Sequence, residues 1–393
     1  MSATVWAYPW DLVDEGIARA ADCVAGLGLD GIRMAAAYHS GKFLSPRSAH
    51  RRVVFPEGGV LYFRPRGSGF HGLAIQPVLS HLLDGADPLE EVTRECHRRG
   101  MTATAWVVLA HNTRLAQRYP EYQVRNAFGD GYAYCLCPAQ PATREYILAL
   151  IGGLVASYDV DAVELESPGY LGFLHGYHHE FYGVAPGLVE QCLLALCFCP
   201  ACQRMLREEG IDPEPLQARV RDTVDRGFDH GPADASRVEE IFREDPELWA
   251  LVTKRVETVT ALISEIAALV HARGKKLFCF APVFVEPASL DWVEGTEARR
   301  LAPLVDCWEL ALYSPDQPER VARAQRAASL GLPCALGAGI NAGSACTCDA
   351  EDLVSAALAA KGAGIQHIGF YNYGVLPQAR LQWLSQAAEA FRS

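Results

Sequence analysis

The stretch Thr143–Glu166, TREYILALIGGLVASYDVDAVELE, contains two different structural signals one after the other. Apolar side chains recur at helical spacing from Thr143 to Tyr158, and Val160–Glu166 is a short, largely apolar run of the kind that forms a buried strand. A helix that leads directly into such a strand is the repeating unit of a parallel sheet. We therefore predict an α/β protein, and the rest of the chain decides which type.

Apolar runs like the one that ends at Glu166 recur along the whole chain. They are Val5–Tyr8, Gly31–Ala37, Thr102–Ala110, Val160–Glu166, Lys276–Val283, Asp306–Leu312, Pro333–Gly339 and His367–Tyr371. The helices predicted around them are Asp11–Leu27, Asp87–Arg99, Thr143–Tyr158, Pro246–Arg273, Glu297–Leu304, Gln317–Leu330, Ala350–Ala363 and Pro377–Arg392. Eight βα units are the number in a closed (β/α)8 TIM barrel, so we predict this single-domain fold for residues 1–393 rather than an open doubly wound sheet.

Two long segments interrupt the repeat. Residues 38–86 follow the second predicted strand and are rich in polar residues, glycine and proline, and residues 167–245 follow the fourth. Both insertions begin at the carboxyl end of a strand, which is the face where TIM barrels place their active sites. We expect both to lie beside the active site.

The overall composition limits the classes of partner. The formal net charge is −12, from 35 basic and 47 acidic residues, and no block of lysine and arginine occurs, so nucleic acid is excluded as a partner. No apolar run approaches the ~20 residues that span a bilayer, and the N-terminal segment has neither a basic stretch nor an apolar core. We expect a cytoplasmic protein without membrane contact; homo-oligomerisation stays open.

Five of the 13 cysteines fall in two tight clusters, Cys135 with Cys137 and Cys197 with Cys199 and Cys202. Disulfides are rare in the cytoplasm, whereas four thiolates are the ligand set of closed, tetrahedral zinc sites. We predict a structural Zn²⁺ at Cys137, Cys197, Cys199 and Cys202, and Cys135 is an alternative to one of these ligands. Four thiolates leave no open position on the metal, so we expect no direct role for it in catalysis.

The sequences around these cysteines are distinctive. Cys137-Pro-Ala-Gln-Pro-Ala-Thr-Arg-Glu-Tyr, together with Cys197-Phe-Cys-Pro-Ala-Cys-Gln-Arg-Met-Leu-Arg, resembles the zinc-binding pattern of glycoside hydrolase family 42 β-galactosidases. In that family a cysteine after strand three joins a C-x-C-x₂-C motif in the strand-four insertion. The resemblance covers residues 130–210 closely and the rest as barrel architecture. It implies a carbohydrate-active barrel related to the retaining glycosidases.

The catalytic positions of that clan are only partly matched. The clan carries an Asn-Glu acid/base at the end of strand four and a glutamate nucleophile at the end of strand seven. Here Glu166 lies at the end of the fourth predicted strand, but Leu165 stands in the place of the asparagine. The seventh strand and the two residues after it, 333–341, contain no carboxylate.

Three glutamates remain as candidates from the residues themselves. Glu164 and Glu166 alternate along one strand and both face the barrel interior, and Glu309 comes from the sixth predicted strand. Burying two carboxylates close together raises at least one pKa, which is how a general acid is made at neutral pH. We predict Glu166 as the general acid and Glu309, or else Glu164, as its partner. The alternative is that one of these glutamates pairs with an arginine such as Arg33 to hold the barrel.

Aromatic and polar side chains gather at the predicted strand ends, as expected for a site that binds a polar ligand through a few apolar anchors. The predicted substrate-binding residues are Trp6, Tyr8, Tyr38, His39, Trp106, His111, Asn112, His175, His179, Tyr371 and Asn372.

We therefore predict a glycoside hydrolase that acts on a small oligosaccharide or glycoside. A second hypothesis is a metal-dependent sugar lyase or isomerase, because His175 and His179 have i, i+4 spacing and would bind a divalent ion together with a glutamate. A third is a carbohydrate-binding barrel without catalysis, which the missing carboxylate on the seventh strand favours.

Overall fold

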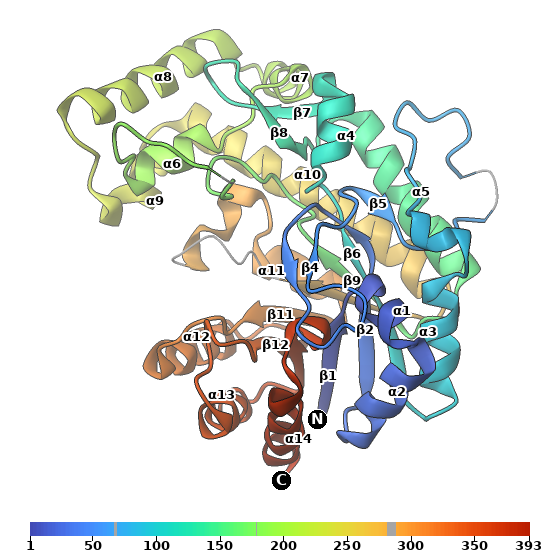
Figure 1. Ribbon diagram of the computed structural model, residues 1–393. Helices are drawn as coiled ribbons and strands as arrows, with labels where there is room; N and C mark the ends of the chain where they lie inside the picture. Colours follow the sequence, from blue (N-terminus) through green and yellow to red (C-terminus); the bar gives the residue numbers. More distant parts are fainter. Residues whose placement is uncertain (67–68, 178, 281–287) are drawn as a thin grey trace.

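The computed structural model in Figure 1 describes residues 1–66, 69–177, 179–280 and 288–393. The predicted end of the fifth apolar run, residues 281–283, lies outside the described residues.

A closed barrel of eight parallel strands forms the centre of the molecule (Figure 1). The strands are β1 (Ser2–Ala7), β2 (Gly31–Tyr38), β6 (Thr102–Val108), β9 (Ala162–Glu166), β10 (Lys276–Phe280), β11 (Cys307–Ala311), β12 (Ala335–Asn341) and β13 (His367–Tyr371). They pair in this order, and β1 pairs with both β2 and β13, so the sheet has no open edge within the barrel. This confirms the TIM barrel and excludes the open doubly wound sheet.

Helices surround the barrel and cover the outward faces of its strands. The βα helices are α1 (Pro9–Glu15), α2 (Ile17–Gly26), α3 (Pro88–His97), α5 (Pro141–Ser157), α10 (Pro246–His271), α11 (Ala298–Leu301), α12 (Gln317–Ser329), α13 (Ala350–Gly362) and α14 (Gln378–Arg392). Val163 and Leu165 of β9 belong to the same buried apolar cluster as Ile147 and Ile151 of α5. The alternate residues of β9, Glu164 among them, face the interior.

The predicted helix over residues 11–27 is two helices in the structure. Gly16 has φ +91°, outside the helical region, and separates α1 from α2. Glycine adopts this conformation without the penalty that a Cβ atom brings, so the chain turns here although the apolar pattern continues. The predicted helix Glu297–Leu304 is also shorter, because α11 gives way to the 3₁₀ turn Ala302–Leu304.

Three segments extend the strand ends. Residues 39–87 contain the hairpin of β3 (Phe43–Leu44) with β4 (Val53–Val54), β5 (Val60–Leu61), which pairs antiparallel with β2, and the 3₁₀ turn His81–Asp84. Residues 167–245 contain α6 (Leu188–Leu194), α7 (Pro200–Glu208), α8 (Pro213–His230), the 3₁₀ turn Ala235–Arg237 and α9 (Val238–Glu244).

The third segment follows β6 and was not separated from the repeat by its sequence pattern. It contains α4 (Thr113–Arg118), the 3₁₀ turn Pro120–Tyr122, and the antiparallel hairpin of β7 (Gln123–Arg125) with β8 (Gly131–Leu136). Two further 3₁₀ turns, Ala288–Glu294 and Tyr373–Val375, follow β10 and β13.

In the described part of the chain, no helix has the length and apolar character needed to cross a bilayer.

Candidate functional site

A buried group of three charged side chains lies in the middle of the barrel. Arg33 of β2 approaches Glu309 of β11 with Nη1 to Oε2 at 2.5 Å, and the same nitrogen is 3.4 Å from Oε1 of Glu164 on β9. Arg33 Nε donates to Thr4 Oγ1 at 2.7 Å, and Trp6 Nε1 donates to both oxygens of Glu164 at 3.0 and 3.1 Å. Four barrel strands are thereby joined by polar contacts at one level.

The charges of this group do not balance if both carboxyls ionise. Burial raises the pKa of Glu164 well above its usual range, and the nearby carboxylate of Glu309 raises it further, whereas the Arg33 charge opposes the shift. One cation offsets only one buried carboxylate, and an uncompensated charge in the interior is costly. The second carboxyl beside Arg33 therefore has a raised pKa, because a single cation cannot compensate both groups.

Two glycines make room for this group. A Cβ atom on Gly337 of β12 would lie 2.6 Å from Cγ of Glu309, and one on Gly369 of β13 would lie 2.4 Å from the ring of Trp6. Contacts this short do not occur between real Cβ atoms and their neighbours. The seventh strand therefore has no side chain at this level because Glu309 occupies the space.

Glu166 lies at the carboxyl end of β9, closer to the mouth of the barrel, and is half-buried. Trp106 Nε1 of β6 donates to its Oε2 at 2.7 Å. Burial raises the pKa of Glu166 to about 7, although the hydrogen bond from Trp106 opposes the shift. No salt bridge among the described residues includes Glu166, in contrast to Glu164 and Glu309.

Three tyrosines lie close enough to Glu166 for its charge to act on them. Burial, together with the negative charge of Glu166, raises the pKa of Tyr38, Tyr313 and Tyr371. Tyr8 Oη is 3.1 Å from Tyr38 Oη and is also hydrogen bonded to Tyr371 Oη. The tyrosines are therefore neutral hydrogen-bonding groups at the barrel mouth.

Most of the aromatic residues predicted to bind substrate pack on one another. Of these, Trp6, Tyr8, Tyr38 and Trp106 are buried and Tyr371 is half-buried, and they pack together with the buried Trp10. Tyr8 stacks on Trp10 with ring centroids 4.5 Å apart, and Tyr38 contacts Trp106 at 4.9 Å. These rings form one packed cluster that reaches Glu166 through Trp106, and Tyr371 is its partly exposed member.

The two predicted asparagines hold local turns. Asn112 Oδ1 accepts from Leu115 N at 2.9 Å and caps α4, and Asn372 Oδ1 accepts from Gly374 N at 3.1 Å. Both residues are buried, and each side-chain oxygen already has a backbone partner.

The predicted histidines divide into a stack and a loop residue. The ring of His111 lies 4.2 Å from that of His39 and 4.3 Å from that of His175. His179 is exposed, has φ +58° and lies outside any helix, so the i, i+4 spacing with His175 is not helical in the structure. Among the described residues, these histidines do not form a cluster of three convergent metal ligands.

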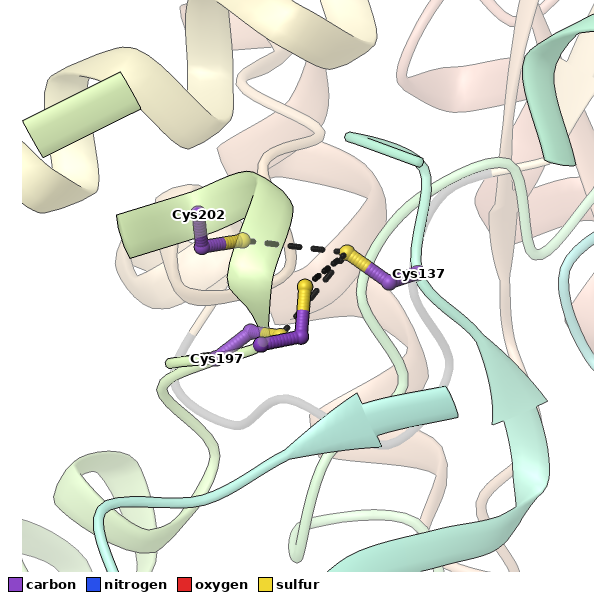
Figure 2. A group of neighbouring side chains, drawn as sticks. Cys137, Cys197 and Cys202 are labelled. Carbon is purple, nitrogen blue, oxygen red and sulfur yellow. Dashed lines mark hydrogen bonds between the residues drawn. The ribbon is translucent and has the colours of Figure 1, made fainter. Parts of the chain in front are cut away.

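The four cysteines Cys137, Cys197, Cys199 and Cys202 come together. Figure 2 shows the side chains of Cys137, Cys197 and Cys202 pointing toward one another. Their sulfur atoms all lie within 4.8 Å of one another, and Cys137 Sγ is 3.7, 3.6 and 3.7 Å from those of Cys197, Cys199 and Cys202. A tetrahedral ion with metal–sulfur bonds of about 2.3 Å places its sulfurs about 3.8 Å apart, so the arrangement fits such a metal ion.

Donors outside the cluster point at two of its sulfurs. Arg125 N donates to Cys197 Sγ and Gln140 Nε2 to Cys199 Sγ, both at 3.4 Å, which is the type of outer contact that supports metal-bound thiolates. Cys135 Sγ donates instead to Leu136 O at 3.3 Å and stands outside the group of four.

In a comparison with known proteins, one family model matches part of the chain. The family model described as Glycosyl hydrolase-like 10 matches residues 53–182, which include β6, β9 and both Glu164 and Glu166. No curated protein sequence matches the chain.

Several solved glycosidases are similar in structure. A β-galactosidase from the psychrophilic Marinomonas ef1 has a TM-score of 0.60 at 11% identity, over 99% of this chain and 59% of its own. The PgaB (BpsB) glycoside hydrolase domain from Bordetella bronchiseptica has a TM-score of 0.58 at 14% identity, and the match covers 99% of this chain and 97% of that domain. Alpha-L-fucosidase isoenzyme 2 from Paenibacillus thiaminolyticus has a TM-score of 0.56 at 13% identity, and the match covers 95% of this chain and 45% of the fucosidase. The chain thus spans about half of the fucosidase and the β-galactosidase, and identities this low show a shared fold.

Sequence reasoning missed two features of the site. Tyr313 follows β11 and lies near Glu166. No motif in the sequence around Tyr313 identified it as a candidate site residue. The β7–β8 hairpin could have been predicted. In the stretch GYAYCL at residues 131–136, the two tyrosines alternate with smaller residues, a pattern typical of a strand.

Replacing Arg33 by methionine tests the buried charge group. We expect Arg33→Met to lower the free energy of unfolding by about 3–5 kcal/mol, because a carboxylate is left buried without its cation. Urea denaturation followed by circular dichroism measures the change.

The control is Arg51→Met, because Arg51 pairs with Asp14 at 2.7 Å through a side chain that is 42% exposed, and such pairs contribute less than about 1 kcal/mol. Adding Glu164→Gln and Glu309→Gln to Arg33→Met should recover part of the loss. Equal stability of the Arg33 and Arg51 variants would contradict the assignment.

Proposed function

We propose that the protein hydrolyses glycosidic bonds and that Glu166 donates the proton to the leaving group. The observation that carries the proposal is a half-buried carboxyl at the carboxyl end of a barrel strand, with a pKa of about 7 and no cation paired with it among the described residues. A general acid works best when its pKa lies near the working pH. The partial family match and the fold shared with glycosidases support the same reaction class.

Glu164 and Glu309 receive a different role in this proposal. Both are bound to Arg33 beneath the mouth of the barrel, so a reacting sugar would have to displace a buried ion pair to use either one. The sequence favoured Glu309 as the second catalytic carboxylate. Because Glu309 is bound to Arg33, this role has less support than the role of Glu166 as general acid. The pair instead keeps the interior below Glu166 filled and polar.

The substrate of the proposed reaction is a carbohydrate. Tyr38, Tyr313 and Tyr371 supply neutral hydroxyl groups beside Glu166, and the partly exposed ring of Tyr371 offers a face to a sugar. An apolar wall with a few hydrogen-bonding groups suits a neutral polar ligand.

Glu166→Gln tests the acid directly. We expect kcat/KM on glycosides with poor leaving groups to fall by about 10²–10⁴-fold, because the amide cannot donate the proton. Rates on a panel of nitrophenyl glycosides and oligosaccharides give the measurement, with Glu265→Gln on the outer helix α10 as the surface control. Full activity of Glu166→Gln would remove the central residue of the proposal, and absence of hydrolysis by the wild-type protein across the panel would favour a binding function.

Trp106→Phe tests the origin of the pKa. Since the acid must be protonated, kcat/KM is highest below the pKa of Glu166 and falls as the pH rises through about 7. The Trp106 N–H stabilises the carboxylate and so lowers this pKa. Its removal should shift the alkaline limb of the pH–rate profile to higher pH, and a shift to lower pH would contradict the hydrogen bond.

For the cysteine cluster we propose a structural Zn²⁺ bound by Cys137, Cys197, Cys199 and Cys202. The sulfur spacing fits the tetrahedral geometry of zinc, and four thiolates close its coordination shell. The ion would tie the end of the β7–β8 hairpin to the start of α7, at a distance from the proton transfer.

Cys202→Ser tests the metal site. We expect purified wild-type protein to hold close to one equivalent of zinc, and Cys202→Ser to lose most of it together with thermal stability, because binding energy at a structural site is also folding energy. Elemental analysis and thermal denaturation measure both. The matched control is Cys135→Ser, which should retain the metal because this thiol faces Leu136 O. Metal-free wild-type protein would overturn the proposal.

A further inference from the structure

A cavity with a volume of about 280 Å³ lies beside strand β8 of the β7–β8 hairpin. Its lining includes Tyr132, Tyr134, Tyr177, Tyr182, Phe173 and Glu180. We call it the tyrosine groove. Neither the predicted metal site nor the proton transfer at Glu166 uses it.

The tyrosines of the groove are held in place with their faces aligned. Tyr132 and Tyr134 are alternate residues of β8, and their rings stack at 5.7 Å with 28° between the planes. Tyr177 stacks on Tyr134 at 5.6 Å and 27°. Tyr132 Oη donates to Leu194 O and Tyr134 Oη to Gly172 O, so both rings are fixed before any ligand arrives. Such preorganisation lowers the entropic cost of binding.

The groove is open to solvent. Tyr177 and Tyr182 are 46% and 54% exposed, a large fraction for aromatic residues. Among the described residues that line it, Glu180 supplies a carboxylate and there is neither lysine nor arginine. A ligand with acidic groups would therefore meet a carboxylate without a compensating cation, whereas a neutral ligand would meet flat apolar faces edged by hydroxyl groups.

A continuous series of rings connects the groove to Glu166. Trp106, which donates to Glu166, contacts Tyr38, and from Tyr38 the series passes through His39, His111 and His175 to Tyr134. Each step joins ring centroids 4.2 to 5.4 Å apart. The groove is thus joined to the proposed acid by a series of packed rings, of which Trp106, Tyr38 and His111 are buried.

We propose that the tyrosine groove binds the distal units of a neutral oligosaccharide whose scissile bond lies at Glu166. The inference rests on the proposed hydrolysis and adds a substrate class to it, which is a chain of several uncharged sugars. Pyranose rings present C–H faces that pack on tyrosine rings, and their hydroxyl groups bond to the phenols and to Glu180.

Binding to a glycan array, followed by calorimetric titration, tests the inference. The array carries neutral and acidic oligosaccharides from disaccharide to hexasaccharide, and the protein carries Glu166→Gln so that ligands stay intact. We expect binding to neutral glycans only, with affinity that rises with chain length. Tyr177→Ala and, separately, Tyr182→Ala should each weaken binding of the longest ligand by about tenfold, a typical loss for an exposed aromatic anchor. Phe181→Ala is the matched control, because this ring is 88% exposed on the same segment and does not line the groove.

Several outcomes would overturn the inference: binding that prefers acidic glycans, affinity independent of length, no binding to any array glycan, or no effect of either tyrosine variant. The two proposals fail separately. If the wild-type protein hydrolyses glycosides but Tyr177→Ala does not change glycan binding, the proposed function stands and the proposed role of the groove is wrong. Tyrosine-dependent binding of long neutral glycans without hydrolysis would confirm the groove and remove the proposed function.

Discussion

The contact of Arg33 with Glu164 and Glu309 is the constraint around which the barrel is arranged. It joins β2, β9 and β11 at one level, and Trp6 adds β1 through its hydrogen bonds to Glu164. A buried cation of this kind tolerates little displacement, because moving Arg33 away leaves a carboxylate charge in the interior. The register of β9 is fixed by Glu164, and this register in turn places Glu166 two residues further along, at the barrel mouth beside Trp106.

The hairpin after β6 carries residues of both the cysteine cluster and the tyrosine groove. Its strand β8 carries Tyr132 and Tyr134 on one stretch, and Cys137 follows directly after its end. Cys197 Sγ accepts from Arg125 N, and Phe198 N donates to Arg125 O at 2.6 Å, so the cysteine segment also contacts β7. The cysteine cluster and the tyrosine groove therefore share one rigid support.

The sequence was sufficient to predict the barrel and its eight strands, but not every contact of the side chains inside and around it. Each predicted strand contains or overlaps an observed one, because buried parallel strands are short apolar runs that the chain repeats. The break at Gly16 was missed since the apolar pattern continues through it. Asn112 and Asn372 stand at strand ends like sugar ligands, yet both oxygens cap turns, a local use that sequence alone does not separate from binding. From the sequence, pairing of one glutamate with Arg33 was an alternative. In the structure Arg33 contacts both Glu164 and Glu309. Sequence patterns do not reveal this arrangement, because the three residues lie on strands far apart in the chain.

The charged group at the barrel centre also has a consequence for how the chain is made. Arg33 and Glu309 are 276 residues apart, and Thr4 Oγ1 donates to Ile368 O across 364 residues. At synthesis rates of about 5–20 residues per second, Arg33 leaves the ribosome on the order of tens of seconds before its carboxylate partner. Throughout that time the edge of β1 that later pairs with β13 has no strand beside it. Until the last strand emerges, the nascent chain therefore exposes an unpaired strand edge, which is the kind of surface on which another chain can pair.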